Sequence, residues 1–479
     1  MTAVMQRQNG GTAGTAEVDR LLLELEKNLE GAKLSLQQQQ DLLSQLKVLG
    51  RTADNASPIF TKRGISVLSK YGLDRDDAPD TSREALRCLA NAFYLNEPCR
   101  QTFVDLGYAP KAAERLKADN RDDEFLVARM LFLLTYKTKI DFGALINQHQ
   151  LAESINQHIA RHAKRFSKAE ITSSATSPMH DMSMTETLKL LYNIIHHYPD
   201  QGSRFLPSIE PLTNIILYFP LQKQPLQPPI TSALNALGKL DLQATEPGAK
   251  VEQESSVSPL FPKSDPKSVI ERLTFILDGA IRRQPEKDID EAAATLCALL
   301  ILGYELGTQE TKSWMQELLL PTSEDREKPL GQGDTLASRL LRLSCSPVLP
   351  RLRVVISSLL FELSDKDADK FIKNIGYGFA SGFLASKNIQ IPRTAMDSGI
   401  TGSDGVTEAG FDINPVTGQR LSAERANASK VKEMTDEEKE REAEKLFVLF
   451  ERLKATGVMN VQNPVEQAIQ EGRFEELDD

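Results

Sequence analysis

Two histidines four residues apart are the clearest candidates for chemistry in this sequence. His158 and His162 have the i, i+4 spacing that places two imidazoles on one helical face, where they could share a metal ion. No adjacent Glu and no third ligand of the right type follows, and Arg161, Lys164 and Arg165 add positive charge around the pair. We therefore interpret this segment as a solvated basic helix face and predict no metal site.

The other motifs that could support catalysis are weak. Gly331–Gln332–Gly333 has no Lys or Ser/Thr in the position that a phosphate-binding loop requires, and no strand pattern precedes it. His196 and His197 end an apolar segment, as helix C-terminal residues do. The histidines and serines form no nucleophile–base pattern. We expect no catalytic residues, no cofactor and no bond-making activity.

The composition of the chain restricts its class and its partners. A net charge of −10 argues against a broad surface for nucleic acid or anionic membrane. The four cysteines show no CxxC spacing, and all but Cys99 lie within apolar helical patterns, which predicts buried free thiols in a reducing compartment for Cys88, Cys99, Cys297 and Cys345. The N-terminus has no signal-peptide pattern and no window is apolar enough to span a membrane, so we expect a cytoplasmic protein.

Leu-, Ala- and Ile-rich segments of 10–14 residues recur along the chain and determine the fold prediction. The clearest are 85–95, 125–135, 187–196, 231–240, 291–302, 336–343 and 353–363. Asn91 and Leu133 are 42 residues apart, as are Asn193 and Asn235. Armadillo and HEAT repeats have steps of about 40–47 residues. The sequence therefore predicts an all-α armadillo/HEAT-like superhelix.

Changes in composition divide the chain into five parts. We predict a disordered leader at 1–15, the superhelical domain at 16–386, a flexible linker at 387–433, a C-terminal helix at 434–457 and an acidic tail at 458–479.

A glycine-interrupted stretch, 371–385, ends the superhelical domain. Gly376, Gly378 and Gly382 break an apolar run, which indicates either a broken helix or two closely packed helices. We expect all three glycines to be structural.

The C-terminal helix has an unusually clear start signal. Thr435 and Glu438 form a capping-box pattern, and an apolar stripe follows. The stripe consists of Leu446, Phe447, Leu449, Phe450 and Leu453. A helix this amphipathic either folds back on the superhelix or binds a partner.

Basic and amide side chains recur at equivalent positions of the repeated segments. They are Arg87, Asn91, Arg129, Lys189, Asn193, Asn235 and Lys239. Stacked repeats place equivalent helices on one concave face, so these residues could bind an extended peptide or a helix. The alternative is that the asparagines bond a neighbouring loop carbonyl within the stack.

Several segments together resemble the synembryn family of exchange factors and chaperones for heterotrimeric G-protein α subunits (Gα), in a form like the fungal members. They are ALRCLANAFYLN (85–96), RMLFLLT (129–135), LKLLYNI (188–194), SRLLRL (338–343), LLFELSDKDADKFIKNIGYGFASGFLA (359–385), INPVTG (413–418) and MTDEEKEREAEKLFVLFERL (434–453). The order and spacing of the last three are the specific part, and the resemblance covers roughly 20–460.

The resemblance implies that the concave face receives the C-terminal helix of GDP-bound Gα and that the chain's own C-terminal helix reaches Gα near its switch region. GDP then leaves, and nucleotide-free Gα is held until GTP enters. The same binding would protect newly made Gα, which gives a chaperone role in Gα folding. The negative net charge and the lack of a membrane-spanning window predict no nucleic-acid partner and no membrane insertion. The Gα partner implies recruitment to the plasma membrane. The alternative function is an armadillo-type scaffold or adaptor without exchange activity.

Overall fold

The computed structural model describes residues 2–31, 33–75, 78–166, 177–243, 258, 260–390, 413–414, 416–428 and 441. These residues form helices, and the β-type contact among them is an isolated antiparallel bridge between Ile413 and Arg420. None of the helices within these ranges is long and apolar enough to cross a membrane. The predicted all-α class is confirmed.

The first half of the chain contains α1 (Thr2–Leu29), α2 (Leu36–Leu49), α3 (Lys62–Leu73), α4 (Pro79–Leu95), α5 (Pro98–Asp105), α6 (Ala109–Arg115), α7 (Arg121–Leu134), α8 (Phe142–His149), α9 (Leu151–Lys164), α10 (Pro178–His197), η1 (Pro199–Ser208), α11 (Ile209–Tyr218) and α12 (Ile230–Leu237). The second half contains α13 (Ser268–Arg283), η2 (Glu286–Asp288), α14 (Asp290–Leu306), α15 (Gln309–Leu319), η3 (Asp325–Glu327), α16 (Leu336–Ser344), α17 (Pro350–Glu362), α18 (Ala368–Ile375), α19 (Tyr377–Ser386) and α21 (Leu421–Ala428).

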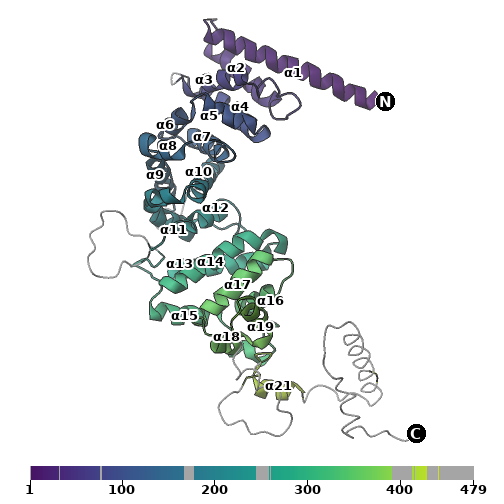
Figure 1. Ribbon diagram of the computed structural model, residues 1–479, viewed down its shortest axis with the longest axis vertical. Coiled ribbons are helices and arrows are strands. Elements are labelled where there is room, and N and C mark those ends of the chain that lie inside the picture. The colour runs from purple at the N-terminus through teal and green to yellow at the C-terminus, as the bar shows by residue number, and fades with distance from the viewer. Residues whose placement is uncertain are drawn as a thin grey trace.

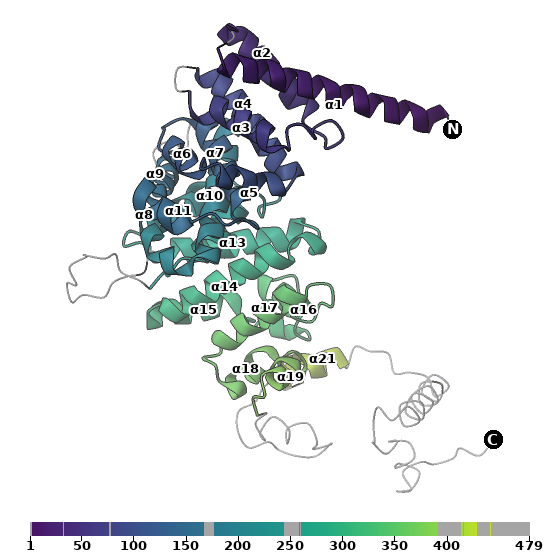
Figure 2. The same ribbon diagram turned by 45° about the horizontal axis from the view of Figure 1, so that its top comes forward.

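The helices stack into an elongated superhelix that curves along its length (Figure 1, Figure 2). One row of helices, α2, α4, α7, α10, α12, α14 and α17, packs each member against the next. In Figure 1, α4, α7 and α10 lie toward the inside of the curve, whereas α6, α8 and α9 lie on the opposite side. We call α4, α7, α10 and α12 the inner helices. Six of the seven repeated segments of the sequence therefore lie on one row of packed helices, whereas the segment 336–343 forms α16, which packs beside α17 outside this row.

Side-chain caps determine where several of these helices begin. The Ser35 hydroxyl accepts a hydrogen bond from the Gln38 N–H, and the Gln38 side chain accepts one from the Ser35 N–H, which completes a capping box on α2. Asn120 caps α7 by accepting from the backbone N–H groups of Asp122 and Asp123 at 3.0 and 3.2 Å. The acidic first turn of α7 also complements the positive N-terminal end of its helix dipole.

One apolar core runs through the stack from Val18 to Leu384. Cys88, Cys99 and Cys297 are buried free thiols, as predicted, and burial raises the pKa of Cys297 to about 12. Cys345 is exposed, so the prediction of burial was wrong at that position. The reason is that Cys345 is the C-cap residue of α16, where the apolar stripe of the helix has ended.

The N-terminal segment also differs from the prediction. α1 begins at Thr2, within the part of the chain expected to be a disordered leader. The second half of α1 is fixed because Val18, Leu21 and Leu25 are fully buried. Extending an existing helix adds one hydrogen bond per residue without a new nucleation step, which explains how the weakly helical leader continues α1.

The glycine-interrupted stretch forms two short helices, α18 and α19, which meet at Gly376. Gly376 has a φ of +79°, and a Cβ there would lie 3.0 Å from the carbonyl oxygen of Val416. Gly378 donates its N–H to that same oxygen at 3.1 Å. By contrast, a Cβ at Gly382 would have no neighbour within 4 Å. The structural role predicted for the glycines therefore holds at Gly376 and Gly378 and is wrong at Gly382.

Replacing Gly376 by valine is expected to lower the free energy of unfolding by about 2–4 kcal/mol, because the backbone strain and the collision with Val416 add together. Gly382→Ala is the matched control, and it should change stability by less than about 1 kcal/mol or increase it, since alanine favours a helix interior. Urea denaturation measures both variants. A Gly376→Val midpoint equal to wild type would show that the junction is loosely packed.

Residues 413–414 and 416–428, which we call the clip, return to the end of the stack beside α18 and α19 (Figure 2). Leu330 donates its N–H to the Thr417 carbonyl at 3.1 Å, and Arg420 donates its N–H to the Arg326 carbonyl at 2.8 Å. α21 lies against η3. The clip belongs to the segment predicted as a flexible linker at 387–433, so this part of that segment is attached to the superhelix.

Candidate functional site

The inner helices bring the predicted binding residues onto neighbouring elements. α4 packs on α7, α7 on α10, and α10 on α12. Arg87 and Asn91 lie on α4, Arg129 on α7, Lys189 and Asn193 on α10, and Asn235 on α12, with Lys239 just beyond its end. The predicted set is therefore spread along one continuous row rather than over separate parts of the fold.

Arg87 forms ion pairs within and between helices. Its guanidinium lies 2.7 Å from the carboxylate of Glu84 on the same helix and 3.4 Å from that of Asp122 on α7. Lys47 of α2 also contacts Glu84, at 2.7 Å. Because the Arg87 side chain remains 33% exposed, it can still meet a partner on the inner face.

Arg129 and Lys189 share one acidic partner. Their side-chain nitrogens lie 3.5 and 3.1 Å from the same oxygen of Glu186, whose side chain is 6% exposed. Both cations are 38% exposed, so the buried carboxylate holds two partly solvated positive groups in place. One negative charge between two positive ones leaves this part of the surface locally basic.

The asparagines have different environments. Asn193 is 4% exposed and donates to the Thr135 hydroxyl at 2.8 Å, which joins α10 to the end of α7. Asn235 accepts a hydrogen bond from the Thr295 hydroxyl of α14 at 3.2 Å. These bonds resemble the structural alternative considered above, although the partners are hydroxyls rather than loop carbonyls. Asn91 is half-buried on α4.

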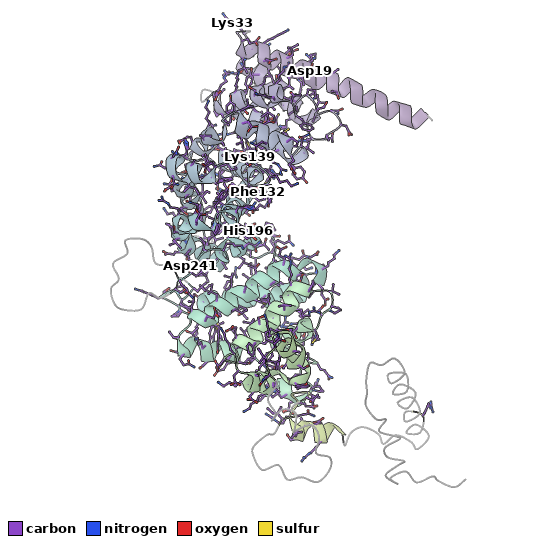
Figure 3. All side chains as sticks on the ribbon, in the orientation of Figure 1. Asp19, Lys33, Phe132, Lys139, His196 and Asp241 are labelled. Atoms are coloured by element: carbon purple, nitrogen blue, oxygen red, sulfur yellow. The ribbon has the colours of Figure 1, made fainter. Side chains whose placement is uncertain are left out.

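Five rings at the C-terminal ends of α7 and α10 form a continuous row, which we call the aromatic band. They are Phe132, Tyr136, Tyr192, His196 and His197. Phe132 and Tyr136 meet edge to face at 5.4 Å between ring centroids, and Tyr136 lies 6.3 Å from His197. His197 lies 5.0 Å from His196, which stacks on Tyr192 at 5.9 Å. Figure 3 shows Phe132 and His196 on adjacent layers of the stack.

Cations cover both ends of the aromatic band. The Lys189 ammonium lies 5.7 Å from the Phe132 ring centroid, and the exposed Lys239 lies 5.6 Å from that of Tyr192. A pocket of about 380 Å³ adjoins the second end, lined by His196, Lys239, Asp241 and others. Rings with flanking cations can bind apolar and anionic groups together.

Sequence reasoning missed the aromatic band. His196 and His197 were interpreted only as residues at a helix end, and they do lie in the last turn of α10. The missed signal was spacing: Phe132 and Tyr136 are four residues apart, as are Tyr192 and His196. Residues at i and i+4 share a helix face, and such pairs on two neighbouring helices can meet.

The histidine pair considered as a metal site is buried, so its interpretation as a solvated face was wrong. His158 and His162 are 1% and 4% exposed and flank the carboxylate of Glu124 on α7. Glu124 accepts from His162 Nε2 at 2.8 Å and from the Thr187 hydroxyl at 2.7 Å, and lies 3.3 Å from His158 Nδ1. No local pattern indicated this contact, because Glu124 lies 34 residues before His158.

This cluster is built for packing rather than for metal binding. His158 Nε2 donates to the Leu116 carbonyl at 2.7 Å. Burial alone would raise the pKa of Glu124, but the hydrogen bonds from His158 and His162 outweigh burial and hold it far below its usual range. Among the described residues, no group of three or more His, Cys, Asp or Glu side chains is arranged to hold a metal ion.

The predicted stripe of the C-terminal helix lies outside the described residues. A role in Gα binding therefore stays a prediction for Leu446, Phe447, Leu449, Phe450 and Leu453.

Comparison with known proteins places the chain in a family. A family model described as guanine nucleotide exchange factor synembryn matches residues 42–473. This chain belongs to the synembryn family. It is 27% identical over 417 residues to a synembryn-like chaperone of Schizosaccharomyces pombe, covering 82% of this chain and 76% of that protein. It is 26% identical over 458 residues to the chaperone Ric-8A of Danio rerio, covering 86% and 80% of the two chains.

The synembryn match includes every part of the candidate site. The inner helices, the clip and the predicted C-terminal helix all lie within residues 42–473. This chain is also 25% identical over 475 residues to the chaperone Ric-8A of Xenopus tropicalis. The match covers 91% of this chain and 84% of that protein. The resemblance found in the sequence is confirmed at the level of the family.

Proposed function

We propose that this synembryn-family chain is a guanine-nucleotide exchange factor and folding chaperone for monomeric Gα. The inner helices bind the C-terminal helix of GDP-bound Gα, GDP leaves, and the nucleotide-free protein is held until GTP binds. The family match over 42–473 is the observation that carries this proposal. A cytoplasmic site of action, with recruitment to the plasma membrane through Gα, is part of it.

The chemistry of the inner face supports this proposal. A helix that ends in a carboxylate offers apolar side chains and a negative charge, and the aromatic band with Lys189 and Lys239 offers surfaces suited to both. Arg87 and Arg129 extend the positive groups along the row. On a chain with a net charge of −10, such a local basic region would orient the partner as it approaches.

The second candidate is an armadillo-type scaffold or adaptor with no effect on nucleotide. The amphipathic C-terminal helix distinguishes the two, because an adaptor that binds only through its inner face has no use for that helix. Release of GDP from purified Gα, with and without the chain, tests the choice. Faster release supports the exchange factor, and an unchanged rate with intact binding supports the adaptor.

The double variant Arg87→Ala with Lys189→Ala is expected to weaken binding of a Gα C-terminal peptide at least tenfold, because charge-assisted contacts are each worth about 1.5–3 kcal/mol. The melting temperature should change little. Glu84 keeps its contact with Lys47, and the buried Glu186 keeps its contact with Arg129, so each carboxylate still has a cation beside it. Fluorescence anisotropy of a labelled peptide measures the affinity.

The matched control is Lys111→Ala with Lys164→Ala, which removes the same charge from α6 and α9 on the other side of the stack. This control should bind the peptide as tightly as wild type. Equal losses in the two double variants would mean that overall charge, rather than the inner face, governs binding. Unchanged affinity in the Arg87/Lys189 variant would contradict the assignment.

A further inference from the structure

We propose that Glu186 is a positioning residue of the inner face. It fixes Arg129 and Lys189, which we call the cation pair, in the arrangement that binds the terminal carboxylate of the Gα C-terminal helix. This inference rests on the proposed function, because it concerns how that helix is recognised. Three observations support it: the burial of the shared acid, the donors that the cation pair keeps for a ligand, and a second cluster of the same design.

The acid is buried and its two cations are not. The Glu186 side chain is 6% exposed, whereas those of Arg129 and Lys189 are each 38% exposed. Their nitrogens lie 3.5 and 3.1 Å from one Glu186 oxygen, so they cannot be farther apart than the sum of these two distances. Without the carboxylate, two like charges this close would repel each other and move apart. Glu186 therefore determines the separation of the cation pair.

Aromatic rings confine the cation pair further. The Lys189 ammonium lies 5.7 Å from the Phe132 ring centroid, and the Arg129 guanidinium carbon lies 5.9 Å from that of Phe125. A cation over a ring is attracted to its face and keeps its charge. With a ring and the Glu186 carboxylate beside each cation, both long side chains are ordered before a partner arrives, which lowers the entropy cost of binding.

The cation pair keeps hydrogen-bond donors for a ligand. Arginine and lysine side chains carry several N–H donors each. In the described part of the chain, Glu186 is the one carboxylate that forms an ion pair with Arg129 or with Lys189. Because both side chains are partly exposed, their remaining donors can bind a second carboxylate from the solvent side. The end of a helix suits this position, since its terminal carboxylate adds to the negative end of the helix dipole.

A second cluster of the same design occurs earlier in the row of helices. Glu84 and Arg87 are three residues apart on α4, which is the spacing of the glutamate and the lysine on α10. Glu84 is 12% exposed and also contacts Lys47 of the preceding helix in the row, α2, at 2.7 Å. Asp122 gives Arg87 an additional acidic partner at 3.4 Å. Glu186, by contrast, positions both of its cations alone, so its removal should have the larger effect.

Glu186→Gln separates positioning from simple attraction. The substitution removes a negative charge, so attraction alone predicts tighter binding of an anionic peptide. Positioning predicts the opposite: affinity for a Gα C-terminal peptide should fall about tenfold, because two long side chains must then be ordered on binding. Wild type should bind this peptide about tenfold more tightly than the same peptide with an amidated C-terminus. The variant should lose that preference and bind the amidated peptide like wild type. Fluorescence anisotropy measures all four affinities.

Glu114→Gln on α6 is the matched control. Glu114 pairs with Lys117 at the same spacing, at 2.7 Å, on a helix outside the row. It undergoes the same change of charge and should bind both peptides like wild type. If Glu186→Gln lowers the melting temperature, Glu186→Asp replaces it: this variant keeps the buried charge but withdraws the carboxylate by one methylene, and its affinity for the acid peptide should fall about threefold.

The outcomes separate the inference from the proposed function. Wild-type or tighter binding of the acid peptide by the Glu186 variant would overturn the inference, even if the wild-type chain releases GDP from Gα. Equal binding of the acid and amidated peptides by wild type would also overturn it, because the terminal carboxylate would then make no contact. If the wild-type chain binds neither peptide, the proposed binding of the Gα C-terminal helix fails, and the inference fails with it.

Discussion

Replacing Phe447 and Phe450 together by alanine is expected to lower the rate of GDP release from Gα by about 100-fold at limiting concentrations, because burial of each ring contributes about 1.5–3 kcal/mol. The melting temperature should not change if the stripe docks on Gα rather than on the superhelix. Binding of the isolated Gα C-terminal peptide to the inner helices should also be unaffected. Stopped-flow release of a fluorescent GDP analogue, together with calorimetry, measures all three properties.

Two matched proteins sharpen this test. Glu444→Ala with Arg452→Ala changes the opposite face of the same predicted helix without changing the net charge, and it should leave exchange intact. Truncation after Ala428 removes the helix but keeps the clip, whose hydrogen bonds stabilise the end of the stack. The truncated chain should melt like wild type and lose exchange. A lowered melting temperature in the Phe447/Phe450 variant would instead mean that the stripe packs on the superhelix, and unimpaired GDP release would contradict its role.

Replacing Glu124 by alanine is expected to lower the free energy of unfolding by about 3–5 kcal/mol, because it leaves buried polar groups without their acidic partner. His158, His162 and Thr187 all approach this carboxylate, so α7, α9 and α10 lose a shared connection. Urea denaturation measures the effect. Glu153→Ala, at an exposed position of α9, is the control and should stay within about 0.5 kcal/mol of wild type.

The same carboxylate predicts a pH dependence. The pKa of Glu124 is lowered in the folded state, so ionisation of this group stabilises the fold above its unfolded pKa of about 4.3. That contribution is lost as the pH falls through the lower folded pKa. The stability difference between wild type and Glu124→Gln should therefore be largest above about pH 5 and shrink in more acidic solution. A difference that grows as the pH falls below about 4 would contradict the assignment.

The helical repeats could be predicted from sequence because their cause is local. Apolar residues at helical spacing mark the buried face of each helix, and the step of 42 residues between equivalent asparagines reflects one layer of the stack. The break at Gly376 was also visible, since glycines that interrupt an apolar run disfavour a continuous helix. The prediction failed at Gly382 because its sequence context is similar to that of Gly376, whereas in the structure a Cβ at Gly382 would have no neighbour within 4 Å.

Contacts between distant residues limited the prediction of the site. His158 and His162 look solvent-exposed in sequence because arginines and lysine surround them, and only packing against α7 brings Glu124 between them. The clip was missed for the same reason: Arg326 and Gly418 are 92 residues apart, and a polar segment without apolar periodicity resembles a linker. The aromatic band required the relative placement of α7 and α10, which no local pattern contains.

Release of GDP from purified, monomeric Gα tests the central claim most directly. Gα loaded with labelled GDP is mixed with the wild-type chain in the absence of free nucleotide. Gel filtration then separates the complex of the two proteins from released GDP. The account predicts faster release, a stable complex that contains no GDP, and dissociation of that complex when GTP is added. A complex that retains its GDP, with release no faster than from Gα alone, would contradict it.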